Sequence, residues 1–314
     1  MAGISLAQSA RMTNDVLQAG VIEVLATESK LLQLLPFMNV QGSGYTYNIE
    51  KNLGNAQFRK VNSGYTYGGI ETIPVTERIV ILGDEAIVDT YQIAVESDIN
   101  NLMAIEVALR SKAIAHKFEK CFLTGGATAG SGVPSETTAN EFVGILTRYN
   151  AAATEVAKTS GGNPTDLQKL QAPQVFEAGT TEDFIGDLDT LLDLVAGGAD
   201  CLIMNKKTRR KLTSKGRAFC EYRQGEFGTQ FVQYGGIDVV DIDGELLDDD
   251  IILAVKFGAK EAVCGLQNGG VRVTALGEME AQPQLKTRIE WFVGLAIFNP
   301  KAVAIRKPRT TTGS

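Results

Sequence analysis

The stretch DINNLMAIEVALRSKAIAHKFEKCFL, residues 98–123, contains no glycine or proline and is the strongest helix prediction in the chain. Ser97 and Asp98 supply capping side chains for its first turn, and Gly125-Gly126 ends it. At 1.5 Å per residue the helix would be about 39 Å long, so we expect it to act as a spine. Its apolar residues form two stripes, Ile99, Met103, Val107, Ile114, Phe118 and Cys121 in one and Leu102, Ile105, Leu109 and Ala113 in the other.

The segments before the spine helix predict an arm followed by a hairpin. Residues 16–35 only partly keep helical spacing before Pro36, which indicates an arm that takes its stability from neighbours. From residue 41 to 93 the apolar pattern has period two, which predicts a long hairpin. The pentapeptide SGYTY occurs at 43–47 and 63–67, around a polar, basic stretch at 50–60. Two matched strand ends around an exposed loop would explain the repeat, and chance repetition is the alternative.

The segments after the spine helix predict an α/β part with a mainly antiparallel sheet. Residues 124–135 and 155–175 are polar and glycine-containing, which is typical of surface excursions. A capped helix is expected from residue 181 to 195, a buried strand at 201–205 and a second helix at 206–215. Further strands are predicted at 237–242, 251–257, 271–276 and 287–298.

The composition excludes several classes of protein. With 44% hydrophobic and 21% charged residues, the chain is neither disordered nor collagen-like. A net charge of −7 makes a dedicated nucleic-acid reader improbable. The single histidine, His116, leaves little room for histidine-based catalysis and is interpreted as a packing or interface residue. Four cysteines without a CxxC pair indicate a reduced, cytoplasmic site of folding, and no apolar run is long enough to span a bilayer.

Three motifs resemble binding sites, and each has a simpler interpretation. The basic run at 206–211, which includes Arg209 and Arg210, suggests a nucleic-acid patch or, as the favoured interpretation, an inter-subunit ion-pair face. The acidic residues at 241–250 depart from calcium-loop spacing and indicate a solvated turn. The glycines at 125–132 lack the lysine of a phosphate loop and indicate a linker. We therefore expect no catalytic residues, no cofactor and no metal site.

The order of these elements resembles the major capsid proteins of tailed bacteriophages with the HK97 fold. The residues that carry the resemblance are Leu35-Pro36-Phe37, GYTYN at 44–48, Val61-Asn62 with Gly64-Tyr65, VTE at 75–77, ILG at 81–83, LIMN at 202–205, GLQN at 265–268 and RIEWFVG at 288–294. The resemblance implies an α+β HK97-like capsid fold with four parts. These are an N-terminal arm (1–40), an E-loop hairpin (41–92), a peripheral domain with the spine helix (93–195, completed by strands at about 278–296), and an α/β axial domain with C-terminal strands (196–314).

The resemblance also implies a function. The chain would be a structural subunit, not an enzyme, that assembles into pentamers and hexamers as the icosahedral shell around packaged double-stranded DNA. Its partners would be copies of itself, scaffolding and portal proteins and possible decoration proteins, with no membrane, and it would fold in the cytoplasm of a bacterial host. Two alternatives stay open: an encapsulin-type shell around cargo enzymes, and a cytosolic α/β enzyme that uses Cys201 or the acidic loop.

The resemblance suggests residues for contacts between subunits. Some relatives crosslink an E-loop lysine to an asparagine with the help of a glutamate; Lys51 or Lys60 and Glu290 fit two of these roles, but no asparagine lies near Glu290 in the sequence. We therefore do not expect the crosslink. A basic E-loop tip on an acidic chain needs a partner, so we expect Arg59 and Lys60 to pair with acidic residues of an adjacent subunit. The candidates for subunit contacts are Arg59, Lys60, Arg209, Arg210 and Glu290.

Overall fold

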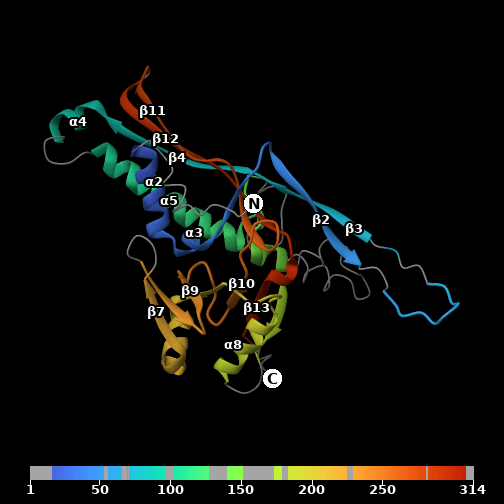
Figure 1. The fold of residues 1–314 in the computed structure, drawn as a ribbon. Coiled ribbons are helices and arrows are strands. Elements are labelled where there is room, and N and C mark those ends of the chain that lie inside the picture. Colours follow the sequence, from blue (N-terminus) through green and yellow to red (C-terminus); the bar gives the residue numbers. More distant parts are fainter. Residues whose placement is uncertain are drawn as a thin grey trace, which may run out of the picture.

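Two β-sheets, the helices that cover them and a projecting hairpin make up the fold (Figure 1). A computed structural model describes residues 16–52, 56–65, 69, 71–96, 102–126, 140–150, 173–178, 183–224, 229–280 and 282–308. The predicted helix start at Ser97 and Asp98, the start of the second helix at 181, and most of the two surface excursions lie outside these residues.

The first sheet has four strands in the order β1-β11-β12-β4. Their bounds are β1 Phe37–Asn39, β4 Val80–Asp89, β11 Val263–Met279 and β12 Gln282–Ile297. The spine helix α5 (Leu102–Thr124) and the arm helix α2 (Val16–Glu28) pack against this sheet, and α4 (Thr90–Glu96) follows β4 at its far end (Figure 1). Phe118 of α5 contacts Trp291 of β12, with ring centroids 5.2 Å apart. Both side chains are fully buried, so this contact fixes the helix to the sheet.

The second sheet has seven strands in the order β5-β13-β10-β6-β9-β8-β7. Four of its six pairings are antiparallel, which confirms the predicted mainly antiparallel sheet. One face packs into the main core, and the other forms a second core with α8 (Phe184–Asp193) and α9 (Lys206–Lys215). The strands are β5 Gln174–Glu177, β6 Cys201–Asn205, β7 Cys220–Gln224, β8 Gln230–Tyr234, β9 Ile237–Ile242, β10 Ile252–Val255 and β13 Val303–Lys307, with short 3-10 turns at Arg217–Phe219 and Pro300–Ala302.

Some predicted strands belong to a different sheet from the one expected. The segments at 271–276 and 287–298, which periodicity groups with the α/β part, lie in β11 and β12 beside the spine helix, and the resemblance places strands at about 278–296 with that helix. Conversely, the division implied by the resemblance places residues up to 195 with the spine helix, but β5 and α8 lie in and on the seven-stranded sheet, which agrees with the periodicity grouping of the helix at 181–195. Apolar periodicity predicts a strand but not its partner, because pairing depends on segments far apart in the chain. Strands from both sides of residue 196 share each sheet, so the four-part division stays a prediction.

The spine helix is confirmed, and only its first stripe is buried. Val107, Ile114 and Phe118 are buried in the main core, whereas Ile105 and Leu109 of the second stripe are exposed. The helix ends at Thr124, and Gly126 takes a positive φ of 68°, a conformation that glycine adopts without strain.

The predicted hairpin is formed by β2 (Gly44–Asn52) and β3 (Glu71–Arg78). Residues 44–47 pair with 75–78, not with the second SGYTY segment, so the repeat does not mark matched strand ends. β4, which follows β3, leaves the hairpin and joins β12. The hairpin is therefore two-stranded and projects from the body (Figure 1).

The arm is an integral part of the core, contrary to the expectation that it takes its stability from neighbours. Its helices α2 and α3 (Lys30–Leu34) bury a set of side chains to 2% exposure or less: Val21, Ile22, Leu25, Leu31, Leu32 and Leu35. The expectation failed because apolar residues occur on both faces of α2, so the sequence pattern does not reveal the buried face. In the structure one face is buried and the other, with Leu17, Glu23 and Thr27, is exposed. Residues 1–15 lie outside the described part of the chain.

Leu32→Ala tests this conclusion. Leu32 is fully buried, so its truncation should lower the free energy of unfolding of the unassembled chain by about 2–5 kcal/mol. Urea unfolding at concentrations below assembly measures this. The control is Leu17→Ala, at a residue that is 40% exposed, with an expected change within about 0.5 kcal/mol. If Leu32→Ala left the free energy of unfolding of the unassembled chain unchanged, the arm would be stabilised by other copies instead.

Candidate assembly surfaces

A buried ion pair fixes the root of the projecting hairpin, which is the part of β2 and β3 around Tyr47 and Glu77 that contacts the body. Arg148 donates to both carboxylate oxygens of Glu77 on β3, at 2.6 and 2.8 Å, and the two side chains are only 5% and 9% exposed. The Tyr47 hydroxyl on β2 donates to the carbonyl of Ile297 at 2.8 Å and to Glu77 at 3.2 Å. Burial, followed by the charge of Glu77, raises the pKa of Tyr47 well above its ordinary value. Both hairpin strands are thus tied to the four-stranded sheet.

Aromatic contacts support the same root. Tyr47 and Phe298 have ring centroids 4.7 Å apart, and Tyr45 meets Phe298 edge-on at 6.0 Å. These rings pack beside the small cluster of Val40, Leu266 and Ala296. The direction in which the hairpin projects is therefore set by packed side chains.

The hairpin tip, residues 56–65 between β2 and β3, presents apolar side chains on an ordered turn. The Ser63 backbone N–H and hydroxyl both donate to the carbonyl of Lys60, at 3.2 and 2.8 Å, and Asn62 has a φ of +66°. The guanidinium of Arg59 donates to the Ser63 carbonyl at 3.2 Å. Phe58 is fully exposed and Val61 is 90% exposed. Exposing two large apolar side chains is costly in water, so the tip has the character of a contact surface.

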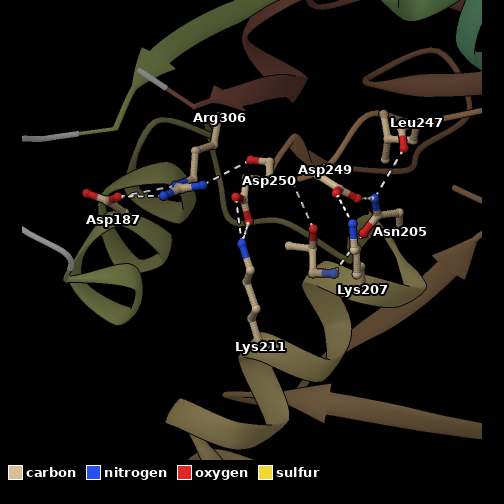
Figure 2. A network of polar contacts seen from close by, with 9 residues as sticks. Asp187, Asn205, Lys207, Lys211, Leu247, Asp249, Asp250 and Arg306 are labelled. Carbon is tan, nitrogen blue, oxygen red and sulfur yellow. Dashed lines mark hydrogen bonds and ion pairs between the residues drawn. The ribbon is translucent and has the colours of Figure 1, made fainter. Parts of the chain in front are cut away.

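The basic helix α9 is neutralised by the acidic loop of the same chain. Residues 206–215 include six cations and residues 241–250 include six carboxylates, and four of the cations pair with carboxylates of that loop. Figure 2 shows Lys207 paired with Asp249, and Lys211 bound to both oxygens of Asp250 at 2.6 and 2.7 Å. Lys206 pairs with Asp243. These pairs lie at the surface and contribute little stability, but they remove the positive field that a phosphate backbone would need.

Buried polar groups hold the acidic loop in place. Asn205 caps α9 by accepting from the Thr208 N–H at 2.7 Å, and its amide donates to the Leu247 carbonyl and to Asp249 (Figure 2). Arg306 on β13 donates to Asp187 at 2.8 Å and to the Asp250 carbonyl at 2.9 Å. The loop is therefore packed against the body and is not a simple solvated turn.

The two arginines of α9 have different surroundings. Arg209 lies 3.8 Å from Asp241, so it has a partner within the chain. Arg210 is exposed, and no ion pair is seen for it among the described residues. It lines an open groove of about 550 Å³ together with Asn205, Lys206, Lys207, Gly244, Asp248 and Asp249.

A junction at Glu119 joins the arm, the spine helix and the seven-stranded sheet. Ser29, the N-cap of α3, donates to the buried Glu119 carboxylate at 2.6 Å. The next residue, Lys30, pairs with Asp241 of β9 at 2.5 Å. Polar contacts thus hold the arm against α5 and β9.

Glu119 sits in an unfavourable place for a negative charge. Burial is the main cause of its raised pKa, and Asp241 and Asp243 add repulsion. The Ser29 hydrogen bond and the nearby His116, with Nδ1 4.0 Å from the carboxylate, act in the opposite direction. His116 is itself half exposed beside this junction.

Glu290 lies on β12, opposite Arg272 on β11 and Gly83 on β4. Its carboxylate is 39% exposed and 3.9 Å from Arg288. The candidate contact residues thus occupy three separate places: the hairpin tip for Arg59 and Lys60, α9 for the two arginines, and the four-stranded sheet for Glu290. One chain does not bring them together.

The cysteines do not support the enzyme alternative. Cys201 is fully buried, and burial raises the pKa of its thiol far above neutral pH. Burial also raises the pKa of Cys121 to about 11 and that of Cys264 to about 12. A neutral, enclosed thiol is a poor nucleophile. Among the described residues, no group of three or more potential ligands is arranged to hold a metal ion.

Comparisons with known proteins identify the fold. The sequence matches no protein-family model and no curated protein. The capsid of a native GTA particle is similar in structure, with a TM-score of 0.61 and 15% identity, covering 90% of this chain and 91% of that chain. A chain of Microbacterium phage Oxtober96 has a TM-score of 0.60 and 12% identity, with 90% and 91% covered. The SrpI encapsulin of Synechococcus elongatus PCC 7942 has a TM-score of 0.58 and 15% identity, with 88% and 86% covered.

These likenesses extend over about nine-tenths of the chain. The protein therefore has the HK97-like capsid fold, as the sequence predicts, with its α+β composition. Within the described residues, no helix has the length and apolar character needed to span a membrane.

Glu77→Gln tests the hairpin root. It leaves the buried Arg148 without a counter-charge, so we expect a loss of about 3–5 kcal/mol in the free energy of unfolding. Adding Arg148→Met removes the stranded charge and should recover part of that loss. Chemical denaturation of the unassembled chains measures both. Additive losses would show that the two residues are not coupled.

Glu119→Gln tests the junction through its pH dependence. Because the pKa of Glu119 is raised by folding, the wild-type chain loses stability as the pH rises through that value. Glutamine keeps the acceptor for Ser29 without the charge, so the variant should be more stable at pH 7 and equally stable in acid. As a control of opposite sign, Glu141→Gln should lose stability at pH 7, because Lys117 lowers the pKa of Glu141. Parallel pH–stability curves for wild type and Glu119→Gln would contradict the assignment.

Proposed function

We propose that this chain is the major capsid subunit of a tailed phage, which assembles into pentamers and hexamers as a closed shell around packaged double-stranded DNA. The observation that carries the proposal is the hairpin. Its root is fixed by a buried ion pair, and its tip exposes Phe58 and Val61 to solvent. A projecting hairpin with exposed apolar side chains is energetically unfavourable in a monomer. In a subunit that contacts its neighbours, the same side chains would be buried. The likeness to capsid shells supports the same conclusion.

The electrostatics suit a container for DNA. The chain carries a net charge of −7, and four of the six cations of its most basic helix pair with carboxylates of the same chain. A wall that repels the phosphate backbone lets DNA slide during packaging. Scaffolding, portal and decoration proteins would be its partners, and the virion its final location.

An encapsulin-type shell is the second candidate, favoured by the likeness to the SrpI encapsulin. The contents of the particle separate the two functions. Nuclease-protected DNA in particles purified from the native source would support a capsid. An enclosed cargo enzyme would support a nanocompartment.

Both candidate functions require the chain to form a shell, so the first test is self-assembly. Negative-stain microscopy and sedimentation of the purified full-length chain should show closed shells or rings. A discrete monomer at all concentrations, also in the presence of lysate factors, would overturn the proposal.

The hairpin tip would dock on the opposite end of a neighbouring copy. That end lies at α4 and the adjoining part of β4 (Figure 1). Ile87, Tyr91 and Val95 of these elements are exposed. Asp89 lies beside them, whereas Asp84 and Glu85 of β4 pair with cations of the same chain. The tip offers apolar side chains together with Arg59 and Lys60, which would match the apolar side chains and the Asp89 carboxylate of that end. Arg210 and Glu290, exposed elsewhere, would take part in other contacts between copies, as would Arg209 beside Asp241.

Arg59→Glu combined with Lys60→Glu tests this contact. The reversed charges should repel Asp89 of the neighbour and reduce shell formation, without changing the stability of the unassembled chain, since both residues are exposed. Light scattering and microscopy measure assembly. The matched control, Arg59→Lys with Lys60→Arg, keeps the charges and should assemble normally. Normal shells from the double Glu variant would rule out an electrostatic role for the tip.

A further inference from the structure

The seven-stranded sheet has two edge strands with different surfaces. Among the described residues, β7 pairs only with β8, and β5 pairs only with β13. An open edge offers a row of N–H and C=O groups to another strand. Proteins protect such edges with short strands, charged side chains, proline or bulges. β7 is five residues long and carries Glu221 and Arg223, but it has no lysine or proline and keeps an unbroken register with β8.

The pairings of the sheet show that β7 and β5 run in the same direction. β7 is antiparallel to β8, which is antiparallel to β9, and β9 is parallel to β6. On the other side, β6 is antiparallel to β10, β10 to β13, and β13 is parallel to β5. A second copy could extend this sheet beyond β7 with its β5, keeping the two faces of the sheet turned the same way. The β5 strand of the second copy would then run parallel to β7 of the first.

The side chains of β7 alternate between two faces. Tyr222, 69% exposed, lies opposite Val232 and so on the side of the second core. Glu221 and Arg223 lie on the side of the main core, where Arg223 contacts Phe231 and pairs with Asp238.

The side chains of β5 have matching faces. Phe176 packs against the second core. Val175 lies opposite Ile305, on the side of the main core, and Glu177 shares that side. Val175 and Glu177 are both exposed.

We propose that β7 of one copy pairs in parallel with β5 of the next, with Glu221 beside Val175, Tyr222 beside Phe176 and Arg223 beside Glu177. This register sets two aromatic side chains side by side on one face and opposite charges on the other. This pairing joins two different surfaces of the chain, because β7 of one copy contacts β5 of the next. Repeating such a contact around a rotation axis generates a closed ring, as pentamers and hexamers require. The inference rests on the proposed shell function and names the strands that would close its rings.

Engineered disulfides test the register. Neighbouring strands lie about 4.8 Å apart, within the Cα separation that a disulfide spans. In a Cys220→Ser background, Glu221→Cys with Val175→Cys should give covalent ladders up to the ring size when assembled particles are oxidised. The matched control, Tyr222→Cys with Val175→Cys, moves one thiol to the opposite face and should give at least tenfold less crosslink.

The outcomes separate this inference from the proposed function. Shells that form normally but give no ladder, or equal ladders from both pairs, would overturn the pairing and leave the shell function standing. A wild-type chain that never assembles would overturn both. If the cysteine variants fail to fold, hydrogen exchange of wild type decides: assembly should slow exchange of amides at 220–224 and 174–177, and unchanged rates would reject the pairing.

Discussion

The packing of Phe118 against Trp291 and Phe37 is the contact on which the rest of the structure depends. Trp291 lies 5.2 Å from each of the other two rings, and all three side chains are buried. They come from the spine helix, the C-terminal strand β12 and the short strand β1 that follows the arm. This one cluster therefore fixes the arm, the helix and the four-stranded sheet relative to one another, and the hairpin root is built on the same sheet.

Most charged residues described above form ion pairs within the chain, and a few are exposed without such a partner among the residues that the structure describes. Where cations and carboxylates are numerous, as at α9 and the acidic loop, they pair within the chain. The buried pair of Arg148 and Glu77 is different, because breaking it would leave a desolvated charge, so it specifies one orientation of the hairpin. By contrast, Arg59 and Lys60 at the hairpin tip and Arg210 on α9 are exposed, and in the proposed shell neighbouring copies would contact them.

Local patterns predicted local structure well and long-range pairing poorly. The spine helix, β6, α9 and β9 were predicted at or near their observed bounds, because each has a clear periodicity or cap. The docking of the arm was missed, although the run of leucines at 31–35 signals burial. The neutralisation of α9 was also missed. Equal numbers of opposite charges at 206–215 and 241–250 were the available signal, but only the packing of Asn205 and Arg306 brings the two segments together.

A shell of rings of five and six requires identical chains to meet at slightly different angles. The hairpin root cannot supply this freedom, because moving it would expose the Arg148–Glu77 pair. The strands beyond the root form only a two-stranded ribbon, which twists more easily than a wide sheet. Backbone pairing at sheet edges tolerates a similar range of twist. For the proposed shell, the fold would thus combine a rigid body, which sets the direction of each contact, with contacting elements that adjust their angle.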